Sequence, residues 1–140
     1  MWRTLFYTTV LGIVIAGSAY GASLRVAPVG FELVGETSAT TLRVWNDEAQ
    51  PVAVQVRVFK WDKGGSGRLE PTSDVVASPP MTTLTPGAEN LIRIVRVANT
   101  PIAPGESYRL LVDELPRQQA AGSGQVQVVV RHSIPITFGN

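Results

Sequence analysis

The chain has 140 residues, with twelve lysine and arginine residues against eleven aspartate and glutamate residues, and it contains no cysteine. This length suits one ordinary domain. The near-balance of charge, without any long run of one sign, argues against nucleic acid and anionic membranes as partners.

Residues 1–21 have the layout of a cleavable signal peptide. A basic start precedes a mostly apolar run, Leu5–Ala16, which is too short to span a membrane, and small residues follow at Ala19 and Gly21. We expect cleavage after Gly21, with cleavage after Ala19 as the alternative and an uncleaved anchor as the less favoured interpretation. Residues 22–140 would then be an exported domain of zero net charge. Because it has no disulfide to stabilise it, the periplasm is the favoured compartment.

Alternating apolar and polar residues predict strands throughout the mature chain, and no segment sustains the 3.6-residue period of a helix. The first strand is interrupted by Pro28 and Gly30, which places it at a sheet edge where it can switch sheets. In Val52–Trp61 the valines share one face, as in a half-buried strand. The strands predicted before residue 100 are Leu24–Pro28 with Phe31–Val34, Thr40–Trp45, Val52–Trp61, Val75–Pro80 and Leu91–Ala98.

The last third of the chain contains two long alternating runs, Ser107–Pro116 and Val126–Pro135, joined by a polar loop at Arg117–Gly124. About seven short strands separated by turn residues predict an all-β, immunoglobulin-like β-sandwich. We expect Trp45 and Trp61 to anchor its core.

Sequence signals for catalysis are weak. The one histidine, His132, has no cysteine nearby with which to form a conventional zinc site. Asp113 and Glu114 are adjacent on a strand and therefore point to opposite faces, so they cannot act as a paired acid and base. The glycine-rich Gly64–Gly67 lacks the lysine of a phosphate-binding loop. We therefore expect no enzymatic activity, no metal, no cofactor and no small-molecule substrate.

Three arginines lie inside apolar strands, where a buried charge is costly unless it is paired. For Arg93 we expect an internal ion pair, with Glu106 or Glu89 as the partner. Arg109 and Arg131 lie on consecutive strands that we expect to be neighbours. Either both are simply exposed to solvent on an outer sheet face, or together they form a fork for a carboxylate.

Five segments of the chain together form a recognisable pattern: Arg57–Trp61, Ser78–Pro80, Thr85–Gly87, Ser107–Pro116 and Arg131–Pro135. They resemble the N-terminal domain of periplasmic pilus chaperones, the PapD-like proteins of the chaperone–usher pathway, and within them the archaic, Csu-type branch. The similarity extends over Leu24–Phe138.

This resemblance implies a specific mechanism. Such a chaperone lends its final strand to an incomplete pilin subunit, and Val126, Val128 and Val130 would enter the subunit's groove. Arg109, helped by Arg131, would hold the subunit's C-terminal carboxylate. The alternative for the valine stripe is that it faces the domain's own core.

Two departures from the family pattern stand out. Classical members have an arginine early in the first strand, for which Arg25 could stand, and a lysine late in the last strand, where this chain has Pro135. The family also has a second sandwich domain, which we expect to be absent here.

The expected function is that of a periplasmic chaperone that caps pilin subunits and delivers them to an outer-membrane usher. The alternative is a stand-alone structural or adhesive module of the cell envelope. An exposed donor edge also predicts a weak homodimer.

Overall fold

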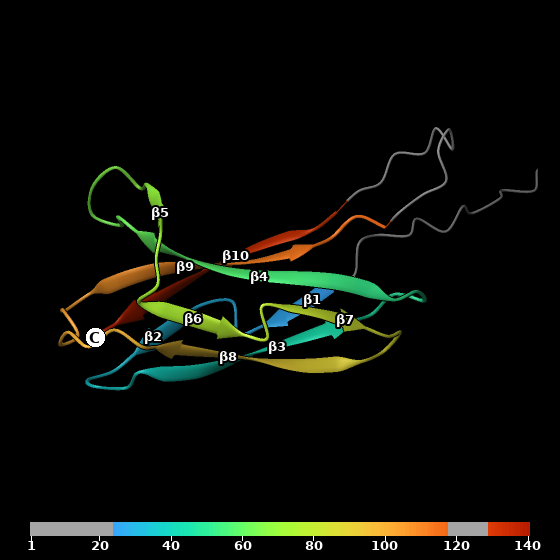
Figure 1. The fold of residues 1–140 in the computed structure, drawn as a ribbon, viewed down its shortest axis with the longest axis horizontal. Helices are drawn as coiled ribbons and strands as arrows, with labels where there is room; N and C mark the ends of the chain where they lie inside the picture. Colours follow the sequence, from blue (N-terminus) through green and yellow to red (C-terminus); the bar gives the residue numbers. More distant parts are fainter. Residues whose placement is uncertain (1–23, 118–128) are drawn as a thin grey trace, which may run out of the picture.

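A computed structural model describes residues 24–117 and 129–140, and the predicted signal peptide lies outside these residues. The described chain is all-β, as predicted, and forms two packed sheets (Figure 1). Within the described residues, no helix is long and apolar enough to cross a membrane. The strands are β1 (Leu24–Ala27), β2 (Phe31–Leu33), β3 (Ala39–Asn46), β4 (Val52–Trp61), β5 (Leu69–Pro71), β6 (Val75–Ser78), β7 (Met81–Leu84), β8 (Glu89–Arg96), β9 (Glu106–Glu114) and β10 (Arg131–Phe138).

One sheet has four strands in the order β1-β3-β8-β6, and the other has six, in the order β2-β10-β9-β4-β5 with β7 also paired to β4. Figure 1 shows β4, β9 and β10 in one layer and β1, β3 and β8 in the other. The sequence predicts about seven strands. The short strands β5 and β7 account for most of the difference, because neither shows a long alternating pattern.

The first strand switches sheets, as its interruption predicts. β1 pairs antiparallel with β3 in the four-stranded sheet, whereas β2 pairs parallel with β10 in the six-stranded sheet. The break contains Pro28 and Gly30, which interrupt a regular ladder.

The core lies between the sheets and follows the two-residue period of the strands. Val52, Val54 and Val56 of β4 are buried. Tyr108 and Phe138 meet edge to face with ring centroids 5.7 Å apart. The other large, fully buried side chains include Leu42, Ile92, Ile94, Leu110, Ile134 and Ile136.

The prediction that Trp45 and Trp61 anchor this core is wrong. Both side chains are only partly buried, and both lie on the outward-facing positions of their strands. Trp45, for example, lies between the fully buried Val44 and Asn46. Each tryptophan instead lies beneath an arginine on an outer face of the sandwich.

Candidate functional site: the edge of the last strand

β10 is paired on one side along its whole length and on the other side only at its end. It pairs with β9 from Arg131 to Phe138, whereas β2 pairs only with Ile136, Thr137 and Phe138. Among the described residues, no strand pairs with the remaining side of Arg131–Pro135. This part of β10 is therefore an open edge to which another chain can add a strand.

The hydrogen-bonding groups of this edge follow from the β9–β10 register. The amide of Glu114 donates to the carbonyl of Val130, 2.9 Å away, which makes these two residues a hydrogen-bonded pair. Because such pairs alternate along an antiparallel ladder, the backbone of Arg131 and Ser133 faces outward. Pro135 would be the next outward donor, but it has no amide hydrogen. The open edge therefore has no amide donor at Pro135, the last residue of β10 before its pairing with β2 begins.

Arg109 lies at the level where the open edge ends, because its register partner on β10 is Pro135. Its guanidinium carbon is 3.9 Å from the centre of the Trp61 ring, and its side chain is partly buried. Within the described residues, Arg109 forms no ion pair with an acidic side chain. Its hydrogen-bond donors are thus available to an external carboxylate.

Arg131 lies elsewhere on the same outer face, and it has an acidic partner. It is the register partner of Asp113, to which its Nε donates a hydrogen bond. Arg57 also donates to Asp113, at 2.6 Å. Since Arg109 and Arg131 are four register positions apart, or about 13 Å along the strand, the structure does not bring them together as one fork.

The Arg57–Asp113–Arg131 cluster borders a pocket at the start of the open edge. Burial would raise the pKa of Asp113, but its hydrogen bonds with Arg131 and Arg57 lower it overall. Burial and the nearby Glu48 raise the pKa of Glu114. The two adjacent carboxyl groups therefore sit in different electrostatic surroundings. The pocket has a volume of about 410 Å³ and is also lined by Glu114, Leu115, Pro116, Val129 and Val130.

Of the three valines predicted to form the donor stripe, Val126 and Val128 lie outside the described residues. Val130 is partly buried and is joined to β9 through its carbonyl. Val129, on the opposite face, is 43% exposed. The predicted strand Val126–Pro135 also ends too early, because β10 continues to Phe138.

The predicted ion pair between Arg93 and Glu106 is wrong, because the partner of Glu106 is Arg96. Along β8, Arg93 is on the exposed face, whereas Arg96 shares the inward face with Ile92 and Ile94. The alternation of the strand could have identified Arg96, since it has the same parity as the two isoleucines.

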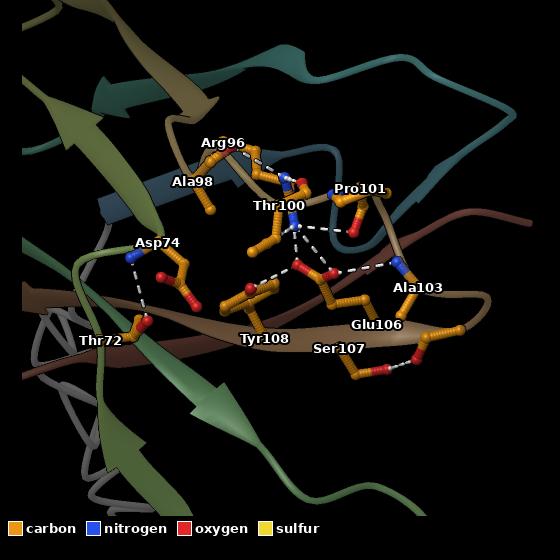
Figure 2. Close-up of polar contacts among 11 residues, drawn as sticks. Thr72, Asp74, Arg96, Ala98, Thr100, Pro101, Ala103, Glu106, Ser107 and Tyr108 are labelled. Atoms are coloured by element: carbon orange, nitrogen blue, oxygen red, sulfur yellow. Dashed lines mark hydrogen bonds and ion pairs between the residues drawn. The ribbon is translucent and has the colours of Figure 1, made fainter.

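Arg96 and Glu106 form the centre of a buried polar network (Figure 2). The Arg96 Nε is 2.8 Å from the Glu106 Oε1, and the Arg96 Nη2 donates to the other oxygen of the same carboxylate. The Arg96 Nη1 donates to the carbonyls of Ala98 and Thr100. Burial would raise the pKa of Glu106, but hydrogen bonds from Arg96, Tyr108 and the Ala103 amide lower it to about 2. The network fixes the connection between β8 and β9.

Arg25, considered from sequence as a possible anchor, lies on the four-stranded sheet. It forms a two-pronged ion pair with Asp47, with distances of 2.7 and 3.0 Å, and lies over Trp45. His132 has a structural contact, because its Nε2 lies 2.9 Å from the carbonyl of Leu24. In the described part of the chain, no three histidine, cysteine or acidic side chains gather in a way that could hold a metal ion.

The fold and the open edge define an immunoglobulin-like sandwich suited to strand addition. Residues 23–138 match the family model described as "Pili and flagellar-assembly chaperone, PapD N-terminal domain". The chain belongs to this family, which is a family of chaperones and not of enzymes. The family resemblance expected from the sequence is thus confirmed.

Solved structures of pilus chaperones are similar to the chain. A chaperone–tip adhesion subunit complex, CsuC–CsuE of Acinetobacter baumannii, matches with 29% identity and a TM-score of 0.72, over 84% of this chain and 52% of that chain. The E. coli chaperone DraB matches with 25% identity and a TM-score of 0.65, over 84% of this chain and 55% of that chain. The chain therefore spans about half the length of these structures. A search of curated proteins gives no match.

Proposed function

We propose that the protein is a periplasmic chaperone that caps pilin subunits through the open edge of β10. The subunit would add a strand along this edge, and its C-terminal carboxylate would bind Arg109. The chaperone would then deliver the subunit to an outer-membrane usher. The similar CsuC–CsuE structure, a pre-assembly complex of a chaperone and a tip adhesion subunit, supports this type of partner.

The observation that carries the proposal is the position of Arg109 relative to the open edge. The edge ends where β2 pairs with Ile136, and Arg109 is in register with the residue before it, Pro135. A subunit strand that runs parallel to β10 along the open edge would have its own C-terminus at the level of Pro135 and Arg109. Its carboxylate would meet a cation that has no acidic partner among the described residues.

The apolar part of the proposed interaction comes from Val126, Val128 and Val130. Alternate residues of an extended strand share one face, so burial of these three valines in the subunit, at about 1.5–3 kcal/mol each, would add substantially to binding. Arg131, expected from the sequence to help Arg109, is separated from it by four register positions and forms an ion pair with Asp113. We therefore propose that Arg131 holds β9 and β10 together and that Arg109 alone binds the carboxylate.

Co-expression with pilin subunits in a bacterial periplasm tests the proposal. The measurement is the amount of soluble pilin recovered with the wild type, with Arg109→Ala and with Val128→Asp. Arg93→Ala is the matched control, because Arg93 is an exposed arginine on the other sheet. We expect recovery with the wild type and the control, and loss with the other two variants.

Equal recovery with all four proteins would show that Arg109 and Val128 are not the binding residues. No recovery with the wild type would favour the alternative function, a structural or adhesive module of the cell envelope.

A further inference from the structure

The outer faces of the two sheets each contain an arginine stacked on a tryptophan. Arg109 lies over Trp61 with 3.9 Å between the guanidinium carbon and the ring centre, and Arg25 lies over Trp45 at 4.3 Å. Stacking of this kind uses the flat face of the guanidinium group and leaves its N–H edges able to donate hydrogen bonds.

The two stacks differ in what those N–H edges bind. Arg25 is neutralised by Asp47 through two hydrogen bonds. Arg109 has no such acidic partner in the part of the chain that the structure describes. The arginine–tryptophan pair on the four-stranded sheet therefore has its anion, Asp47, within the domain. The pair on the six-stranded sheet has no anion among the described residues.

The position of Trp61 is itself well defined. It is the last residue of β4 and pairs with Leu69 of β5. The loop between these strands is closed by Asp62, whose amide donates to the carbonyl of Arg68 and whose carboxylate accepts a hydrogen bond from the Ser66 amide. Trp61 is thus supported by a short hairpin whose conformation its own hydrogen bonds maintain.

We propose that Trp61 is a positioning residue that holds the guanidinium of Arg109 ready for a client carboxylate, so that the β4–β5 hairpin forms part of the carboxylate site. This inference rests on the proposed function, because it requires Arg109 to be the anchor. Free arginine side chains have many rotamers, and restraint before binding reduces the entropy lost when the carboxylate is bound.

The test uses two acetylated hexapeptides of alternating valine and threonine, one with a free C-terminal carboxylate and one with a C-terminal amide. The affinity of each for the protein purified from the periplasm is measured by NMR titration, and the ratio of the two affinities reports recognition of the carboxylate. For the wild type we expect a preference for the acid of about tenfold or more, as for a charge-assisted hydrogen bond.

Four variants separate the inference from the proposed function. Arg109→Ala should abolish the preference for the acid. Trp61→Ala should reduce it about fivefold, by loss of the cation–π contact. Trp61→Phe retains an aromatic face and should therefore keep most of the preference for the acid. Trp45→Ala should leave this preference unchanged.

An unchanged or increased preference in Trp61→Ala, with loss in Arg109→Ala, would overturn the positioning role and leave the anchor intact. A preference that survives in Arg109→Ala, or that is missing from the wild type, would overturn the anchor and the inference with it.

Discussion

Arg131 and Asp113 are direct neighbours across the β9–β10 pair and form an ion pair. Because of this ion pair, the surroundings of Arg131 differ from those of Arg109. Asp113 is also bound by Arg57, so one carboxylate connects β4, β9 and β10 on the outer face of the six-stranded sheet. Arg109 has no comparable acidic partner among the described residues. The same face thus combines a neutralised structural cluster with an arginine available for binding.

Replacing Asp113 by asparagine should destabilise the domain by about 1–2 kcal/mol, because two arginines lose their charged partner. Arg131→Ala should cost less, since the Arg131 side chain is 61% exposed and exposed ion pairs contribute little. Urea unfolding of both variants measures this difference. An equal or larger loss in Arg131→Ala would contradict the assignment of Asp113 as the centre of the cluster.

Glu106→Gln should make stability less dependent on pH. The pKa of Glu106 is lowered from 4.5 to about 2, so its ionised form stabilises the fold above pH 4.5, and this contribution is lost as the pH falls toward 2. The shift corresponds to about 3 kcal/mol. Urea unfolding at neutral and acidic pH should show a large difference from wild type that narrows toward pH 2. A difference that is constant with pH would refute this prediction.

Tyr108→Phe should cost about 1 kcal/mol by removing a hydrogen bond to Glu106. The edge-to-face contact with Phe138 would remain, because the ring is retained. Since Tyr108 and Glu106 share one hydrogen bond, the changes in free energy of unfolding of the two single variants should not add in the double variant. Strict additivity would show that the charge of Glu106 does not strengthen this hydrogen bond, because glutamine retains an acceptor oxygen.

Proline substitutions on β10 should distinguish the open edge from the internal ladder. Ser133→Pro removes an amide that faces outward, and it should block the proposed strand addition and the predicted weak homodimer while largely preserving the fold. Ile134→Pro removes an amide that faces β9 and should strongly destabilise the domain. Thermal unfolding and sedimentation at high protein concentration test both expectations. Comparable unfolding of the two variants would show that the inferred direction of the amides is wrong.

The sequence is sufficient to predict the sandwich, because strict alternation determines which face of a strand is buried. The alternation in Val52–Trp61, for example, predicts the same bounds that β4 has in the structure. The separation of Arg109 from Arg131 could not be predicted, since it depends on the register of β9 with β10, and a long connecting loop leaves that register undefined. Stacking of Trp61 on Arg109 likewise depends on contacts between strands.

The switch of the first strand between sheets also affects the order of folding. Phe31 pairs with Ile136, so the six-stranded sheet joins residues from opposite ends of the described chain. Contacts of such large sequence separation form slowly. A chain that emerges from a translocation channel with its N-terminus first would be unable to complete this sheet until β10 had also emerged. The proposed client-binding edge would therefore form only after the other strands of the sheet were outside the channel.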